Sequence, residues 1–338
     1  MVAFSKCSCW LQTPSTRKVT LHSRLRISTA HDEWNHVVLG LVAMEKGYFR
    51  EEGLEDVELI AFANDEKAQV EALISGLIDI AMDPLIHRVL TAQDKGADIY
   101  IVAPRRKMHS FVIFGQKWMK SIQDLKGQTL HIKEDGETIQ QLKHIVRMGG
   151  LEWGTDVKIV HTTPQFMHDP VYSAKRFLSG ERLLLNVLPW EAEQWSNRGY
   201  PILADTKKLF PPRQDRVVVA TGKLVNGRQD TLTAFLKAYI KASRFLVDRG
   251  NDNETRALVE KAGFLDNDVD RDNFPTILKH VTNRLATDGS LPVEGVAQAI
   301  REQREAGNIS DRVSVEKVLR LEPLHQAQAK LGIEVAQS

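Results

Sequence analysis

The feature that most limits the possible folds is a helix–turn–strand pattern in residues 42–58, which read VAMEKGYFREEGLEDVE. An apolar run over Val37–Lys46 predicts a helix that ends in Lys-Gly-Tyr-Phe, and the charged segment after it turns at Gly53. An extended apolar segment, Val57–Ala61, follows directly. A helix that leads at once into a strand predicts an α/β fold.

The same alternation continues along the chain. Asp65–Ser75 predicts a helix, Ile78–Met82 a short buried strand, and Leu85–Lys95 a second helix, with Asp83 at its N-cap and Pro84 at its first position. A similar series follows later: strands are predicted at Thr129–Lys133, Val157–His161 and Leu183–Leu188, and helices at Ile139–Met148 and Ser173–Leu178. Two similar βα halves therefore predict two lobes.

These patterns predict a leader over residues 1–18, a discontinuous first lobe over 19–112 and 216–338, and a second lobe over 113–215. Arg216–Lys223 is the strand expected to return to the first lobe, and Thr231–Val247 is an amphipathic helix beyond it. The leader has no acidic residue and no apolar core of a secretory signal. Three interpretations of this leader stay open. It is a cytoplasmic tail, an organellar transit peptide, or the result of a wrongly assigned start codon, in which case the protein is periplasmic.

Charge and cysteine content narrow the classes of function. The 338 residues include 45 basic and 44 acidic side chains, a net charge of +1, so no nucleic-acid partner is expected. No apolar run reaches the roughly 18 residues of a spanning helix, so no membrane span is expected. Cys7 and Cys9 are the two cysteines, too close together for a disulfide framework. His31 and His36 with a neighbouring acid could hold a metal, but HExxH and CxxC spacings are absent. No metal site and no cofactor are predicted.

Four segments carry a family resemblance: residues 42–58, the block SG-IDIAM-DP to KGADIYIVA that ends at Ala103, SIQDLKG at 121–127, and the helix 231–247. They resemble the solute-binding proteins of nitrate-, sulfonate- and taurine-type ABC importers, a group that includes the thiamine pyrimidine precursor synthase (NMT1/THI5-like). The resemblance implies a two-lobed periplasmic-binding-protein type II fold, a clamshell of mixed sheets flanked by helices. It also implies that the lobes close on a small organic solute and that an importer permease is a partner.

The resemblance places four loops around the expected binding cleft. The predicted ligand-binding residues on and near these loops are Trp34, Asp83, His87, His109, Asp135, Glu137, Thr138, Trp190 and Glu191. The tryptophans suit a flat or apolar ligand, whereas helix capping and local hydrogen bonding explain many of the polar residues equally well. The acidic turn at 134–137 and the lack of an arginine fork favour a neutral, zwitterionic or cationic solute.

An enzyme on the same fold is the alternative, a decarboxylase or a relative of the pyrimidine synthase that acts on a small aromatic or heterocyclic acid. In that case His31, His36 and His87 are the expected proton-transfer groups, and Asp83 is expected to orient His87. Asp83 occupies the position of the synthase's Schiff-base lysine, and no cysteine follows Cys9. The synthase's own reaction is therefore not expected.

Overall fold

The computed structural model describes residues 2–3, 24–107, 110–132, 139–161, 170–266 and 268–334. The chain divides into two compact units: unit 1 comprises Met1–Lys107 and Gln214–Ser338, and unit 2 comprises Met108–Arg213. The boundaries predicted from the sequence are 112/113 and 215/216. Among the described residues, no helix is long and apolar enough to cross a membrane.

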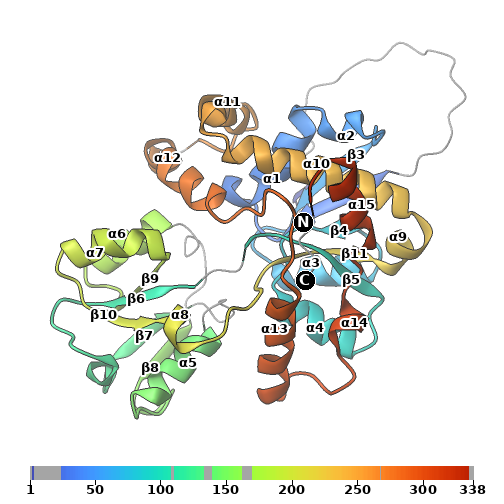
Figure 1. Ribbon diagram of the computed structural model, residues 1–338. Coiled ribbons are helices and arrows are strands. Elements are labelled where there is room, and N and C mark those ends of the chain that lie inside the picture. The colour runs from blue at the N-terminus through green and yellow to red at the C-terminus, as the bar shows by residue number, and fades with distance from the viewer. Residues whose placement is uncertain are drawn as a thin grey trace, which may run out of the picture. The chain divides into compact units, whose positions relative to one another are not determined.

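Unit 1 is built on a mixed six-stranded sheet in the order β1-β3-β2-β4-β11-β5 (Figure 1). Its strands are β1 (Val2–Ala3), β2 (Leu25–Thr29), β3 (Val57–Ala61), β4 (Ile80–Ala81), β5 (Ile99–Pro104) and β11 (Val217–Thr221). β2 pairs in parallel with both β3 and β4, while β11 pairs antiparallel with β4 and β5. The carboxyl ends of β2 to β5 and the first residues of β11 therefore share one edge of the sheet.

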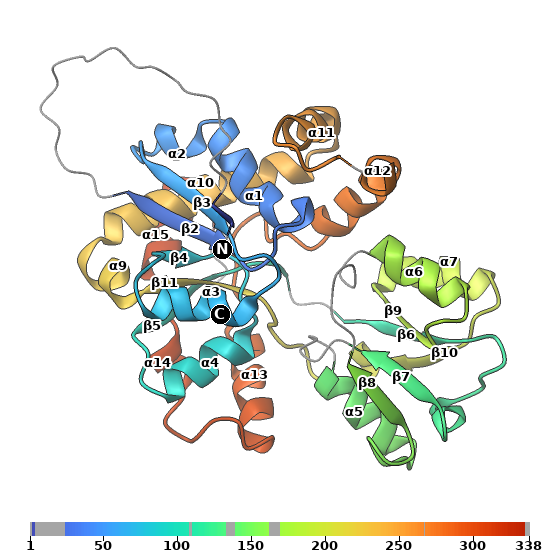
Figure 2. The ribbon, with the colours of Figure 1, turned by 180° about the vertical axis from the view of Figure 1, so that it is seen from behind.

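Helices cover both faces of this sheet, with α1 and α10 on one face and α3 and α4 on the other (Figures 1 and 2). The helices of unit 1 are α1 (Trp34–Glu45), α2 (Tyr48–Glu51), α3 (Glu66–Ile74), α4 (Ile86–Asp94), α9 (Gly222–Gly227), α10 (Gln229–Val247), α11 (Asp252–Lys261), α12 (Asp268–Thr282), α13 (Val293–Glu305), α14 (Val315–Val318) and α15 (Glu322–Lys330), with a 3-10 turn at Arg249–Asn251.

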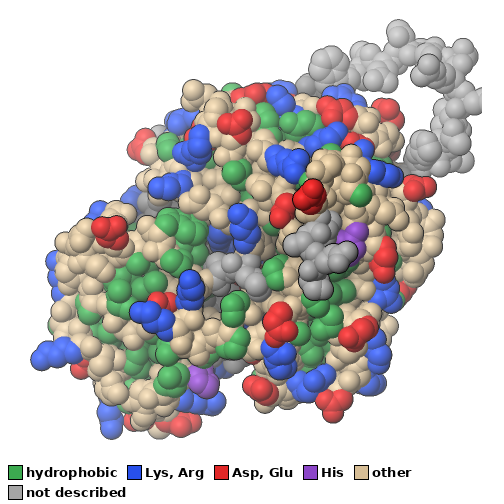
Figure 3. Space-filling view, in the orientation of Figure 1, with side chains coloured by type: hydrophobic (Ala, Val, Ile, Leu, Met, Phe, Trp, Pro, Cys, Tyr) green, Lys and Arg blue, Asp and Glu red, His purple; other side chains and the backbone are tan. Residues whose placement is uncertain are grey.

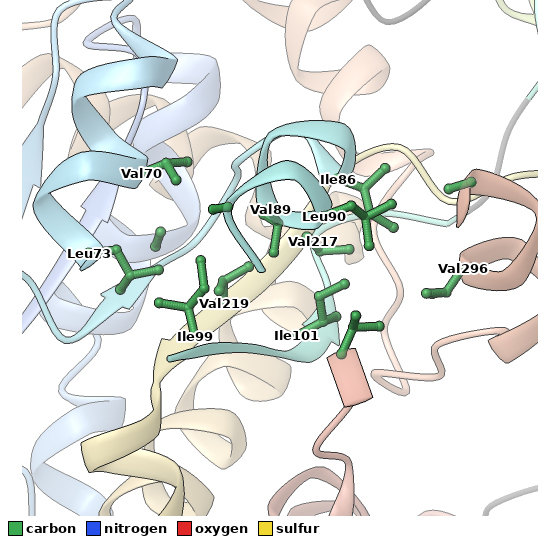
Figure 4. Packing of buried hydrophobic residues seen from close by; sticks show 14 of the residues in the cluster. Val70, Leu73, Ile86, Val89, Leu90, Ile99, Ile101, Val217, Val219 and Val296 are labelled. Atoms are coloured by element: carbon green, nitrogen blue, oxygen red, sulfur yellow. The ribbon is translucent and has the colours of Figure 1, made fainter. Parts of the chain in front are cut away.

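An apolar core fills the space between the sheet and the helices α3, α4 and α13. Leu73, Val89, Ile101 and Val219 contribute to it and are at most 1% exposed, and Val296 of α13 packs into the same cluster (Figure 4). These residues come from both ends of unit 1's sequence. Burial of their side chains therefore joins the C-terminal segment to the first hundred residues.

Residues 42–58 form the end of α1, the short helix α2 and the expected strand β3; the separate helix α2 was not predicted. Gly47 separates the two helices with φ of 75°, in the left-handed region that glycine enters without a Cβ clash. Phe49 is buried and stacks on Phe235 of α10, with ring centroids 5.9 Å apart. Glu52 is bonded to Lys237 and Lys241 of the same long helix. The motif thus docks α2 on α10 through an aromatic contact and several ion pairs.

Unit 2 has an antiparallel sheet in the order β10-β6-β9 and a parallel pair, β7-β8. The strands are β6 (Val112–Gly115), β7 (Thr129–Ile132), β8 (Lys158–His161), β9 (Leu184–Val187) and β10 (Ile202–Asp205). The helices are α5 (Ile139–Met148), α6 (Pro170–Leu178), α7 (Ala192–Asn197) and α8 (Thr206–Leu209), with 3-10 turns at Ile122–Leu125 and Pro189–Glu191.

Alternate residues of β6 point into two separate cores of unit 2. Val112 and Phe114 pack with Phe177 of α6 and Trp195 of α7, whereas Ile113 packs into the cluster that contains Ile145 of α5. The two-residue side-chain period of a strand accounts for this division. Helices of unit 2 accordingly cover both faces of its three-stranded sheet.

Several predicted helix starts are wrong; α6, for example, begins at Pro170 and not at the predicted Ser173. α4 begins at Ile86 with Leu85 at the N-cap, so Asp83 does not cap it and Pro84 precedes it. The carboxylate of Asp83 instead accepts tertiary hydrogen bonds, which the local sequence does not reveal. α1 begins at Trp34, earlier than the predicted Val37.

Candidate functional site

Polar side chains gather at the edge of unit 1 where β2, β3 and β4 end. The segments that follow these strands supply His31, Asn64 and Asp83, respectively. Parallel strands end at the same edge of a sheet, and ligands of α/β proteins bind beyond such edges. We therefore treat this cluster as the candidate site.

Asp83 lies at the centre of the cluster and is fully buried. Its Oδ2 is 2.9 Å from Nδ1 of His36, and its Oδ1 accepts from the backbone N–H of Ala30 at 2.9 Å and from Nε2 of Gln69 at 3.2 Å. Three donors fix the orientation of this carboxylate. The expected partner of Asp83 was His87, and the bond to His36 corrects that prediction.

His31 forms a second histidine–carboxylate pair. Its ring is fully buried, and its Nε2 lies 3.0 Å from Oε1 of Glu66, which also accepts from Nη2 of Arg216 at 2.7 Å. Nδ1 of His31 contacts the side-chain amide of Asn64. The rings of His31 and His36 are 4.1 Å apart between centroids. Each histidine therefore has its own buried carboxylate, and the two rings are in contact.

Glu33 adds a third donor group beside the two histidines. Its Oε2 is 3.8 Å from Nδ1 of His31, and one donor atom from each of His31, Glu33 and His36 lies within 4.8 Å of the other two. The side chain of Glu33 is 33% exposed and that of His36 13% exposed, while His31 is inaccessible. These donor types bind transition-metal ions.

Arginines that directly follow β5 or precede β11 complete this edge. Arg106 forms a two-point ion pair with Asp215 at 2.8 and 3.2 Å, and Arg216 pairs with Glu66. Arg105 is 6% exposed, its guanidinium donates to the backbone oxygen of His36 at 3.4 Å, and no carboxylate among the described residues forms an ion pair with it. A buried guanidinium without a carboxylate favours an anion as its partner.

Tyr239 of α10 holds the backbone beside this arginine. Its hydroxyl donates to the carbonyl oxygens of Pro104 at 3.1 Å and Arg105 at 3.3 Å. Burial raises the pKa of the Tyr239 phenol to about 12. The hydroxyl therefore stays protonated at neutral pH and acts as a donor.

The remaining predicted residues are distributed over both units. Trp34 is 3% exposed and stacks on Phe274 at 4.7 Å, so at least one face of its ring is used in packing. His87 is partly exposed in the first turn of α4. In unit 2, Trp190 is 41% exposed, and Glu191 accepts from the backbone N–H of Leu188 at 3.0 Å. His109, Asp135, Glu137 and Thr138 lie outside the described residues.

A family model of known proteins, described as NMT1/THI5 like, matches residues 34–251, more than half of the chain. The chain belongs to the NMT1/THI5-like family. This match confirms the family that the motifs at 42–58 and 75–103 indicated. No protein of curated function matches the chain significantly.

Solved structures show the fold of this NMT1/THI5-like protein. The periplasmic aliphatic sulphonate-binding protein SsuA from Escherichia coli is 16% identical with a TM-score of 0.62, and the match covers 88% of this chain and 92% of SsuA. The periplasmic nitrate-binding protein NrtA from Synechocystis PCC 6803 is 15% identical with a TM-score of 0.65, covering 91% and 89%. The predicted periplasmic-binding-protein type II fold, with mixed sheets flanked by helices, is confirmed.

An enzyme also has this fold. The desulfurization enzyme DSZB is 14% identical with a TM-score of 0.58, and the match covers 91% of this chain and 100% of DSZB. At this identity the likeness concerns the fold alone. Binding proteins and an enzyme share the architecture, so the site residues must decide the function.

Sequence reasoning missed several residues of the cluster, namely Asn64, Glu66, Gln69 and Arg216. Glu66 and Gln69 are one helical turn apart in α3, and this spacing is equally typical of polar residues exposed to solvent. The backbone of the structure marks the site more clearly, because Ala63 and Asn64 have positive φ angles of 48° and 69°. Such angles outside glycine are uncommon and occur often at functional sites.

Proposed function

We propose that this NMT1/THI5-like protein binds a small organic solute that carries an acidic group. The observation that carries the proposal is Arg105, whose guanidinium is buried beside His36 and has no ion pair with a described carboxylate. A solute carboxylate, sulfonate or similar group would supply the missing negative charge. The sequence favoured a neutral, zwitterionic or cationic solute, and this proposal replaces that class with an acidic one.

The family match supports the binding role. Two of the structures that share the fold are named as sulphonate- and nitrate-binding proteins, and both names describe anionic ligands. Closure of two lobes on the solute and docking on the permease of an ABC importer are part of the proposal. An importer role also requires that the protein lie outside the cytoplasmic membrane, and this location stays a prediction.

The enzyme alternative, with His31, His36 and His87 as proton-transfer groups, is not favoured by the comparisons. In the structure His36 and His31 are each bonded to a buried carboxylate. Such pairs also occur where histidines only bind or position a ligand. We therefore keep solute binding as the function.

A ligand screen with matched arginine variants tests the proposal. Purified full-length protein is examined by native mass spectrometry, and a panel of sulfonates, carboxylates and amines is titrated by calorimetry. We expect Arg105→Gln to weaken the binding of an acidic solute about 10- to 100-fold, the scale of a charge-assisted hydrogen bond. Arg147→Gln, which removes an exposed arginine of α5 in unit 2, should leave the affinity unchanged.

Two results would contradict the proposal. One is binding of the amines alone, with no acidic compound bound. The other is an affinity for an acidic solute that is equal in the Arg105→Gln variant and the parent. Tryptophan fluorescence and circular dichroism establish that each variant is folded.

A further inference from the structure

We propose that His31, Glu33 and His36 form a binding site for one divalent transition-metal ion of the zinc type. One donor atom from each residue lies within 4.8 Å of the other two. Donors bound to a common zinc ion at about 2.0–2.2 Å lie roughly 3–3.5 Å apart, so small side-chain movements complete the arrangement. Two imidazoles and one carboxylate are a donor set that suits zinc.

The two histidine–carboxylate hydrogen bonds indicate which ring nitrogen of each histidine carries the proton. His36 is bonded through Nδ1 to Asp83 at 2.9 Å, and His31 through Nε2 to Glu66 at 3.0 Å. A carboxylate accepts, so each of these nitrogens carries the proton. The lone pairs are then on Nε2 of His36 and Nδ1 of His31, and Nδ1 of His31 is the atom 3.8 Å from Glu33.

These carboxylates are themselves held in place. Asp83 also accepts from the backbone of Ala30 and from Gln69, and Glu66 accepts from Arg216. Histidines that bind metals commonly donate their second N–H to a carboxylate, which fixes the ring orientation and strengthens the ligand. Both histidines here have that partner, and both partners are buried.

Asn64 is the group that now contacts Nδ1 of His31. With its amide nitrogen turned toward the ring, it donates to Nδ1 and to Glu33, in agreement with a lone pair on that atom. The opposite orientation presents a carbonyl oxygen, which is itself a possible metal ligand. Its backbone has a positive φ of 69°, in the left-handed region that asparagine adopts more readily than most residues.

Three protein ligands leave at least one coordination position of zinc for water or for a donor atom of a bound molecule. The exposed parts of Glu33 and His36 give the ion a side from which it can enter. This proposal does not depend on the solute proposal, because Arg105 is not among the metal ligands.

Zinc titration of the full chain tests the site. The parent for the test carries Cys7→Ser and Cys9→Ser and no affinity tag, because thiolates and added histidines bind zinc by themselves. After chelator treatment and dialysis against zinc, elemental analysis should find about one zinc ion per chain. Cobalt in place of zinc should give the visible absorption of a site with imidazole and carboxylate ligands.

Glu33→Gln and His36→Gln are the decisive variants. We expect zinc affinity to fall at least about tenfold in each, measured by competition with a coloured chelator. Glu55→Gln and His325→Gln, which change exposed residues of unit 1, should bind zinc as the parent does. Glu33 is one-third exposed, so its variant should fold even if the His36 variant does not.

The proposal is overturned if the parent retains no zinc after dialysis. It is also overturned if folded Glu33→Gln binds zinc as tightly as the Glu55→Gln control. If the Glu33 and His36 variants lose zinc but keep their solute affinity, the metal site is supported and the Arg105 proposal is unaffected. If Arg105→Gln binds the acidic solute as tightly as the parent, the solute proposal fails and the metal site is unaffected.

Discussion

Oδ2 of Asp83 lies 2.9 Å from Nδ1 of His36, and this bond links the end of β4 to the first turn of α1. The same carboxylate accepts from Ala30 and Gln69, so one fully buried side chain ties together segments that follow β2 and β4 and the helix α3. Asp83 therefore has a structural role whatever molecule the cluster binds.

Asp83→Asn should lower the free energy of unfolding by about 1–3 kcal/mol, because the new amide group turns one acceptor into a donor that faces other donors. Chemical denaturation followed by circular dichroism gives this value. Asp230→Asn, at an exposed position in the first turn of α10, is the matched control and should have little effect. Equal stability of Asp83→Asn and the parent would mean that the carboxylate bonds contribute little.

Trp34→Ala should lower the free energy of unfolding by about 3–5 kcal/mol, because it empties a buried site beside Phe274. Trp190→Ala in unit 2, where the ring is 41% exposed, should lower the free energy of unfolding far less.

The same two variants test the ligand-binding roles predicted for both tryptophans. A ligand role for Trp190 predicts weaker solute binding by about 1–3 kcal/mol in a variant of nearly normal stability.

Glu52→Gln should destabilise the docking of α2 on α10. Although burial opposes ionisation of Glu52, the hydrogen bonds from Lys237 and Lys241 lower its pKa below the usual value. Because the folded-state pKa is lowered, the stabilisation is present above the unfolded pKa near 4.5 and is lost as the pH falls through the folded value.

We expect the Glu52 variant to lose about 1–3 kcal/mol at pH 7 and to approach the parent's stability in acid. Unfolding curves between neutral and acidic pH measure this difference. Glu55→Gln, three residues along at an exposed position, is the control. A gap between Glu52→Gln and the parent that stays constant as the pH falls would argue against the ion pairs.

Tyr239→Phe tests the clamp on the backbone of Pro104 and Arg105. Removal of the hydroxyl should cost about 1 kcal/mol at pH 7, because two carbonyl oxygens lose their donor. Burial raises the phenol's pKa from 10 to about 12, so the parent's stabilisation is complete below pH 10 and declines between pH 10 and 12. The stability gap between parent and variant should therefore shrink in that interval, and a gap that widens would contradict the assignment.

Elements set by local pattern could be predicted from the sequence. β3 at Val57–Ala61 and α5 at Ile139–Met148 have the predicted bounds, because strand alternation and helical periodicity are local properties. Asp65 caps α3 by accepting from the N–H of Ala68. The prediction failed at Asp83, which has the sequence signature of a helix cap but accepts hydrogen bonds from Ala30, His36 and Gln69 instead.

The site was predicted only in part, because several of its hydrogen-bond partners come from segments that are far apart in the sequence. His31, His36 and Asp83 follow strands of the sheet, so their gathering at one edge could be inferred from the α/β pattern. The partners Glu66 and Arg216 are 150 residues apart in sequence, and only the paired strands bring them to 2.7 Å. The burial of Arg105 also depends on packing that its neighbours in the sequence do not determine.

The ion pair between Arg106 and Asp215 joins the two places where the chain passes between the units. Gln214 reinforces it by donating to the carbonyl oxygen of Arg106 at 2.9 Å, and the N–H of Arg105 donates to the carbonyl oxygen of Arg216 at 3.1 Å. The segments on either side of unit 2 are thus bonded directly to each other. A protease cut within residues 108–213 would leave the two halves of unit 1 attached by these bonds and by their shared sheet.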